Sequence, residues 1–204
     1  MAVGLLVTAC GGDEAPEPER GTAVRQCDGT LSPDAARALE EVLRTKAFDD
    51  SPTGGLERST AGLAADYAKG ERRPPTHRLC RASPAAASSA VALQFRLYRD
   101  TELTRGSPVA SLHPYTMGVE ALSGPRKARL YVRCASPRLQ GSDRHPARVV
   151  GELESTWSKL PDTAPIREVH LTILHSATLA VVRKLGCEDD AGLAEKPVLK
   201  PLPE

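Results

Sequence analysis

Four cysteines, spread almost evenly along the chain, constrain the fold more than any other feature of the sequence. They are Cys27, Cys80, Cys134 and Cys187, at separations of 53, 54 and 53 residues. In an exported protein an even number of cysteines is typical of a disulfide framework, so we expect two disulfides. A structural zinc site is the rival use, but its ligands come in close pairs such as C-x₂₋₄-C, which this spacing lacks.

Three pairings of these cysteines are possible, and the sequence does not decide among them. One argument favours Cys80–Cys134 slightly. If segments 91–99 and 128–134 are strands that pair antiparallel, the start of the first lies near the end of the second. Cys80 then comes close to Cys134, and the first and last cysteines of the four join the two ends of the domain.

The first nine residues form a short apolar stretch without a charged side chain, and Cys10 follows it. Val7-Thr8-Ala9 precede the cysteine and Gly11-Gly12 follow it. This segment resembles the lipobox of bacterial lipoproteins, with Val in place of the more usual Leu three positions before the cysteine. The resemblance implies that a diacylglycerol is attached to the Cys10 thiol and that Cys10 becomes the first residue of the mature chain.

A short apolar N-terminus with a chance cysteine is the alternative interpretation. The basic residues that normally precede the apolar stretch of a signal peptide are missing. We therefore expect the natural start to lie upstream, or this segment to be truncated.

Two further segments resemble bacterial lipoproteins, though less specifically than the lipobox does. They are Leu130-Tyr131-Val132-Arg133-Cys134-Ala135-Ser136-Pro137 and the stretch from Ile173-Leu174-His175 to Leu185-Gly186-Cys187. Together with the lipobox they resemble the small secreted lipoproteins of uncharacterised function from GC-rich actinobacteria. The resemblance implies a location on the outer face of the cell membrane, through a lipid anchor, and no particular activity.

We expect four parts along the chain. Residues 1–9 are the remnant of a signal peptide, and residues 10–25 are the lipidated cysteine and a flexible tether. The tether is polar and punctuated by proline, so it cannot bury enough apolar surface to fold. Residues 26–188 form a single globular domain, and residues 189–204 form a loosely packed C-terminal tail rich in proline and charge.

Hydrophobic periodicity predicts helices at residues 33–46, 56–69, 145–157 and 166–185. Ser32 can cap the first of them, with Pro33 in its first turn. The last is the longest periodic segment, so we expect it to be the central core helix, with Gly186 as its stop signal.

Alternation of apolar and polar residues predicts two strands. In segment 91–99, Leu93, Phe95 and Leu97 face one way while Gln94, Arg96 and Tyr98 face the other; segment 129–133 alternates in the same way. A short strand at 108–112 or 118–122 is possible in the loop-like stretch between them. The fold class that follows is α+β, a small antiparallel sheet with helices packed on it, stapled by disulfides.

Charge and hydropathy exclude several classes of protein. With 27 basic and 26 acidic residues the net charge is +1, which gives no chain-wide attraction to nucleic acid, so no nucleic-acid partner is expected. No apolar run approaches the length of about 18–20 residues that a helix needs to span a bilayer, which excludes a membrane channel.

Motifs that carry chemistry are missing from the sequence. It has no G-x-S-x-G, S-x-x-K, G-x-G-x-x-G or P-loop, and the domain cysteines are expected to be oxidised and inert. His170 and His175 are five residues apart and point about 140° from each other on a helix, so they cannot share a metal. We therefore expect no catalytic residue, metal or cofactor.

Four arginines form the one candidate binding surface. If the two strands pair, Arg96, Arg99, Arg129 and Arg133 make a basic outer face that could hold an anionic ligand or a wall polymer. The simpler interpretation is that the aliphatic parts of these arginine side chains lie on the sheet while their guanidinium groups stay in water and bind no ligand.

The leading hypothesis is a lipid-anchored, monomeric binding or interaction module at the cell envelope, with an unidentified envelope protein or ligand as its partner. The alternative is a secreted hydrolase-type enzyme, which a cluster of His113 or His175 with a serine and an acid would favour. A structural spacer is third, and a well-formed pocket would count against it.

Overall fold

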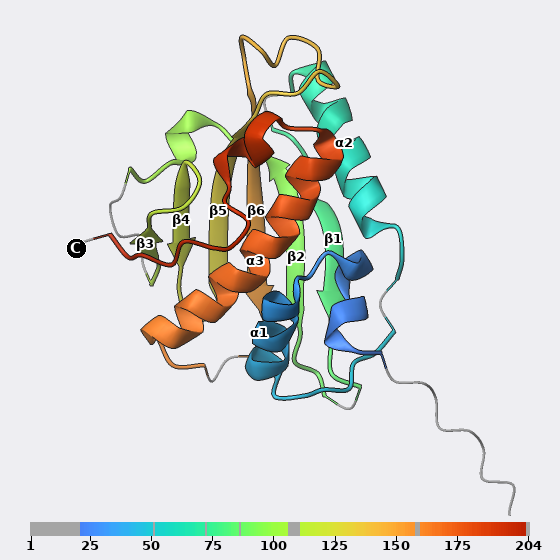
Figure 1. The fold of residues 1–204 in the computed structure, drawn as a ribbon, viewed down its shortest axis with the longest axis vertical. Coiled ribbons are helices and arrows are strands. Elements are labelled where there is room, and N and C mark those ends of the chain that lie inside the picture. Colours follow the sequence, from blue (N-terminus) through green and yellow to red (C-terminus); the bar gives the residue numbers. More distant parts are fainter. Residues whose placement is uncertain are drawn as a thin grey trace, which may run out of the picture.

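A computed structural model describes residues 21–50, 52–71, 73–85, 87–105, 111–157 and 160–202. Within these residues, six strands form one antiparallel sheet, and three helices cover one of its faces (Figure 1). The helices are α1 (Pro33–Leu43), α2 (Gly55–Lys69) and α3 (Ala164–Leu185). The strands are β1 (His77–Ala82), β2 (Val91–Leu97), β3 (His113–Tyr115), β4 (Glu120–Ser123), β5 (Lys127–Cys134) and β6 (Ala147–Ser155). The predicted α+β class is confirmed.

The three helices predicted at 33–46, 56–69 and 166–185 are confirmed, and their ends follow from capping chemistry. The Ser32 hydroxyl accepts a hydrogen bond from the Ala35 backbone N–H at 3.2 Å, which satisfies a free donor of the first turn of α1. Gly186 ends α3 in the left-handed conformation, with a φ of 73°.

The predicted helix at 145–157 is wrong, because most of this segment is strand β6. Val149, Val150 and Leu153 fit a helical stripe, but every second residue from Ala147 to Ser155 is buried against the helices, which is the period of a strand. The β-branched Val149-Val150 pair favours this conformation.

Strand β6 lies in the middle of the sheet, whose order is β1-β2-β6-β5-β4-β3. It pairs with β2 on one side, where Phe95 faces Gly151, and with β5 on the other, where Leu130 faces Gly151. The direct pairing expected between the segments 91–99 and 128–134 is therefore wrong.

Of the remaining strands, β4 confirms the strand expected near 118–122, whereas the alternative at 108–112 lies mostly outside the described residues. Strand β1 was not predicted. Its register shifts between Arg78 and Cys80, which interrupts the alternation that would have revealed it.

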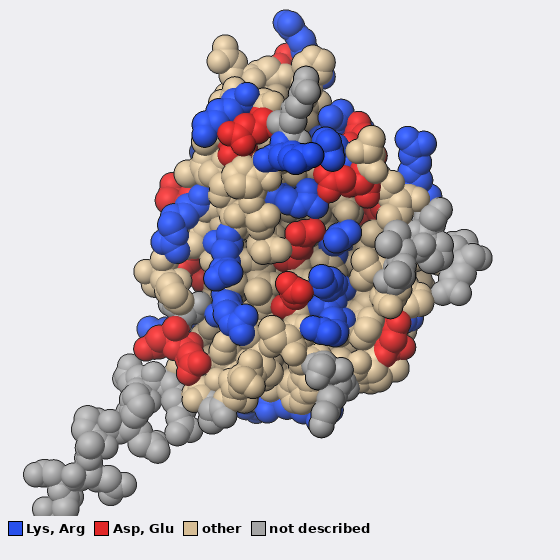
Figure 2. All heavy atoms as spheres, turned by 180° about the vertical axis from the view of Figure 1, so that it is seen from behind, with Lys and Arg blue, Asp and Glu red and all other residues tan. Residues whose placement is uncertain are grey.

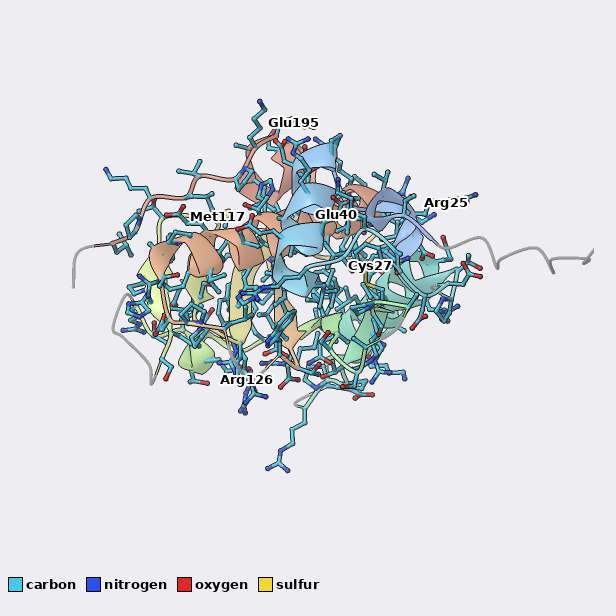
Figure 3. All side chains as sticks on the ribbon, turned by 90° about the horizontal axis from the view of Figure 1, so that it is seen from below. Arg25, Cys27, Glu40, Met117, Arg126 and Glu195 are labelled. Carbon is cyan, nitrogen blue, oxygen red and sulfur yellow. A yellow bond between two sulfur atoms is a disulfide. The ribbon has the colours of Figure 1, made fainter. Side chains whose placement is uncertain are left out.

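The core lies between the helices and the sheet, with α3 running across the middle strands (Figure 1). Seen from below, α1 and α3 lie on one side of the sheet and Arg126 lies on the other (Figure 3). Because α3 crosses β6 closely, position 151 has no room for a side chain. A Cβ there would lie 2.7 Å from Cε1 of Phe95 and 2.9 Å from Oγ1 of Thr178.

The two predicted disulfides are present, but the favoured pairing is wrong. Cys27 is bonded to Cys80 and Cys134 to Cys187, each with a Cα–Cα distance of 5.0 Å. Two strands, β2 and β6, separate β1 from β5, so Cys80 and Cys134 stand on strands about 14 Å apart. A disulfide cannot span that distance.

The C-terminal segment, which we expected to be a loosely packed tail, contacts the domain at several points as far as Leu202. Leu193 is buried, and the Ala194 carbonyl accepts a hydrogen bond from the ring of His175 at 2.9 Å. Farther on, Pro201 bridges Tyr115, so the segment covers the outer edge of β3. Edge strands without such cover are open to unwanted pairing.

No helix in the described part of the chain has the length and hydropathy needed to cross a membrane.

Candidate functional site

The face of the sheet that the helices leave open carries charged side chains in columns. Figure 2 shows basic side chains in two columns with acidic side chains between them. On β5 and β6 the columns follow from strand alternation, because outward residues recur at every second position. On β1 the register shift between Arg78 and Cys80 brings Arg78 and Arg81, which are three residues apart, to the same face. The columns are Arg78 and Arg81 on β1, Glu152 and Glu154 on β6, and Lys127 and Arg129 on β5.

The arginines predicted to form a basic face are partly neutralised by acids from β6 and the loop after β2. Arg96 lies 2.8 Å from the Glu102 carboxylate and 3.4 Å from that of Glu152. Arg129 lies 3.2 Å from the same Glu152 oxygen. Because β6 places Glu152 between the two arginines, the middle of this face is an ion-pair network rather than a free basic surface.

The charges of this network shift the pKa values of Arg96 and Glu102. Partial burial alone would lower the pKa of Arg96, but the hydrogen bond and the charges of Glu102 and Glu152 raise it overall. Burial likewise works against ionisation of Glu102, yet the Arg96 guanidinium and the Arg99 backbone N–H bring the pKa of its carboxyl below 4.5. Arg96 and Glu102 therefore stay ionised at neutral pH.

A second, small apolar cluster lies on the open face beside the network. Tyr98 and Tyr131 meet edge to face, with ring centroids 5.0 Å apart, and Leu122 and Val150 complete the cluster. Burial raises the pKa of both phenols, so both are neutral at physiological pH. This cluster anchors the loop that follows β2.

At the end of the open face nearest the loop 135–146, four arginines surround a cleft of about 460 Å³, which we call the arginine cleft. Two of them, Arg99 and Arg133, belong to the predicted set. The other two are Arg144 and Arg148. Arg148 was missed because segment 145–157 was predicted to be a helix, and Arg144 because it lies in the loop before that segment. The remaining lining comes from the end of α2, the end of β2 and Pro146, and includes Tyr67, Glu71 and Leu97.

Asp100 is the acidic neighbour of this cleft. Its carboxylate lies 2.8 Å from Arg148 and 3.7 Å from Arg133. Arg144 pairs with its neighbour Asp143 at 3.8 Å, but both side chains are more than 70% exposed, so water screens this contact. Arg99 has no ion pair among the described residues.

Of the histidines considered for catalysis, His175 lines a cleft together with Ser176 and Glu195, but its ring and the serine hydroxyl bond to backbone carbonyls rather than to each other. His175 lies in α3, and its Nε2 bonds to the Ala194 carbonyl, while the hydroxyl of the adjacent Ser176 bonds to the Thr30 carbonyl. His113 lies 3.4 Å from the Asp162 carboxylate. The grouping of His175 with a serine and an acid that would favour a hydrolase is therefore not formed by these contacts.

One histidine–carboxylate pair does occur, between α2 and β1. Nε2 of His77 lies 2.7 Å from Oδ2 of Asp66. The imidazole fills the space above Gly62, where a Cβ would lie 2.4 Å from the ring. Ser59, nearby on the same helix, is completely buried, so no substrate reaches its hydroxyl. We therefore interpret the pair as a structural link between α2 and β1.

No cluster of three or more metal-ligating side chains occurs in the part of the chain that the structure describes. Cys10 and residues 11–20 of the predicted tether (10–25) lie outside that part. Of its remaining residues, Gly21 pairs with Phe48 and Ala23 is buried, so residues 21–25 belong to the folded domain.

No protein-family model, curated protein or solved structure matches the chain.

Proposed function

We propose that the protein is a lipid-anchored binding module on the outer face of the cell membrane, which holds an anionic ligand of the cell envelope without transforming it. The observation that carries this proposal is the arginine cleft, where Arg99, Arg133, Arg144 and Arg148 meet at the edge of a hollow. Small-molecule sites are typically such concave surfaces with a few convergent polar groups.

The location is supported by two independent features. The lipobox-like sequence at Cys10 is a signal for lipidation, and the two disulfides are typical of proteins that fold outside the reducing cytoplasm. A thioether-linked diacylglycerol buries many CH₂ groups at about 0.8 kcal/mol each, which holds a domain of this size at the membrane.

The position of the cleft suits an anchored module. The start of the described chain, coloured blue, lies in the lower part of the molecule in Figure 1, whereas the loop 135–146 beside the cleft lies at the upper end. The cleft is therefore at the end of the domain opposite to the start of the described chain.

The anchor is tested by fractionation of an actinobacterial host that expresses the full chain. The wild-type protein is expected in the membrane fraction, and Cys10→Ala is expected in the culture fluid or the soluble fraction. Thr8→Ser, which keeps a small residue beside the cysteine, is the matched control and should stay with the membrane. An unchanged distribution of the Cys10→Ala variant would contradict the proposal.

A further inference from the structure

We infer that the arginine cleft is a binding site for a dianionic phosphate monoester carried on a compact polar body such as a sugar. This inference rests on the proposed binding function and gives that function a ligand class. It is argued from the charge at the cleft, from the hydroxyl beneath it and from its size.

The charge at the cleft is unbalanced. Arg99, Arg133, Arg144 and Arg148 face two carboxylates, those of Asp100 and Asp143, so four positive charges against two negative charges leave +2. Glu71, the acid in the lining, is balanced by Lys69 at 3.7 Å. A phosphate monoester carries close to two negative charges at neutral pH and neutralises this excess. A single carboxylate neutralises only half of it.

Arginine is also the side chain whose shape fits such a group. Its planar guanidinium presents donors in a fork that binds two phosphate oxygens at once. The four arginines come from four separate places, the segment after β2, the end of β5, the loop 135–146 and the start of β6. Guanidinium groups from different directions can surround a tetrahedral anion, which needs donors on several sides.

The hydroxyl of Tyr98 lies beneath the cleft, which its side chain lines while being only 4% exposed. It has no hydrogen bond of good geometry among the described residues, although the Arg133 guanidinium is close enough to act on it. Buried polar groups are normally paired, so each unpaired one calls for an explanation. The charges of Arg133, Asp100 and Arg148 all act on the Tyr98 phenol, which places the hydroxyl under the group of charges that would hold the anion.

In this structure the Asp100 carboxylate occupies part of the space that the phosphate group of a ligand would take. Its carboxylate bridges Arg133 and Arg148, as a bound anion would. It is 44% exposed and stands on a short 3-10 turn after β2, Asp100–Glu102, rather than within a strand. A ligand therefore competes with this internal acid, which favours a ligand with more charge than one carboxylate.

The size of the cleft indicates more than a free phosphate ion. A volume of about 460 Å³ is within the range of small-molecule sites. Tyr67, Pro74, Leu97 and Pro146 also line the cleft, and such surfaces suit the body of a sugar or similar group.

Calorimetric titration of the full-length lipoprotein in neutral detergent, at low ionic strength, tests this inference. The probes are α-D-glucose 1-phosphate, a phosphate monoester, and glucuronic acid, a carboxylate of similar size. We expect saturable binding of glucose 1-phosphate, at least about tenfold tighter than that of glucuronic acid. Equal or tighter binding of glucuronic acid would overturn the ligand class.

Two pairs of substitutions with the same charge change locate the site. Arg99→Gln with Arg144→Gln removes the two cleft arginines that are not held by Asp100, and should weaken binding at least about tenfold. Arg78→Gln with Arg81→Gln removes two exposed arginines from β1 on the same face and should change it by less than about twofold. Equal losses from both pairs would mean a general charge effect and overturn the site.

Asp100→Asn should strengthen ligand binding rather than weaken it, because it removes the acid that competes with the ligand for the arginines. Binding of glucose 1-phosphate should become tighter by about three- to tenfold, and a weaker affinity would contradict the competition. Retained folding of each variant is verified by an unchanged far-UV spectrum and urea midpoint.

Phosphate monoesters also occur as lipid headgroups, so the source is tested separately. Vesicles of phosphatidylcholine with phosphatidic acid should not recruit the Cys10→Ala chain through the cleft. Recruitment lost in the Arg99→Gln/Arg144→Gln variant would identify a lipid headgroup as the ligand and overturn a sugar-like body. No saturable binding of any probe at about 10 mM would refute the inference, while membrane fractionation still tests the anchor on its own.

Discussion

Removal of either disulfide should cost the domain about 4 kcal/mol of unfolding free energy. Each bond closes a loop of the same length, because Cys27–Cys80 and Cys134–Cys187 both span 53 residues. In the chain-entropy model a cross-link over about 53 residues stabilises the fold by about 4 kcal/mol at 25 °C. All four cysteines are buried to a similar degree, so the packing cost of Cys→Ala should also be alike in both pairs.

The two loops do not overlap along the chain, so the two losses should add to about 8 kcal/mol. Typical domains have about 5–15 kcal/mol in total. Each single pair variant, Cys27→Ala/Cys80→Ala or Cys134→Ala/Cys187→Ala, should therefore still fold in the absence of denaturant. The variant without either disulfide should be close to unfolded or fully unfolded.

Urea unfolding followed by the fluorescence of the single tryptophan measures these losses. Trp157 lies just after β6, with the Arg44 guanidinium 5.2 Å from its ring, so its emission reports the docking of the α1 end on the sheet. A loss below about 1 kcal/mol from either pair, or a difference of more than about 2 kcal/mol between the pairs, would refute the reasoning. Wild-type protein treated with reductant serves as the control for the doubly substituted variant.

Two further predictions concern the core and its pH dependence. Gly151→Ala should destabilise the domain by about 1–3 kcal/mol in the same urea assay, because its Cβ would lie 2.7 Å from the Phe95 ring; an unchanged midpoint would contradict the close crossing of α3 over β6. Burial lowers the pKa of His170 and of His175 below 6.5. As the pH falls below about 6.5, the unfolded chain therefore binds protons more readily than the native state, and the free energy of unfolding should decrease. His170→Asn with His175→Gln, which can keep the hydrogen bonds of Nδ1 and Nε2 to backbone carbonyls, should flatten this decrease, and a decrease of unchanged size would count against the assignment.

Local chemistry was sufficient to predict the three helices that the described residues form. The Ser32-Pro33 start of α1 and the Gly186 stop of α3 act within a single turn, so the residues themselves carry the information. The outward and inward faces of β2 were predicted for the same reason, because alternation is a property of one strand.

Long-range placement could not be predicted in this way. Segment 145–157 has apolar residues that satisfy both a helical and a strand pattern, and only its pairing with β2 and β5 decides for the strand. That one error propagated to two other expectations. With β6 absent from the sheet, Cys80 was placed beside Cys134, and the acid Glu152 was missing from between Arg96 and Arg129.

The candidate site shows the same division between local and long-range information. Arg99 and Arg133 were identified from the sequence because they stand on or next to predicted strands. Arg144 and Arg148 join them only through the turn from β5 to β6, and the contact of Asp100 with two of the arginines crosses about 30 to 50 residues of chain. A Pro146 before two β-branched residues was the signal that could have indicated a strand there.

The central claim is that the protein is an exported, lipid-anchored module closed by two disulfides. Its most direct test is the intact mass of the protein from its native membrane fraction, measured with and without reduction and alkylation. The account predicts a chain that begins at Cys10 and carries a lipid adduct, with four further thiols that become alkylated only after reduction. An unmodified N-terminus together with thiols that alkylate without reduction would contradict it.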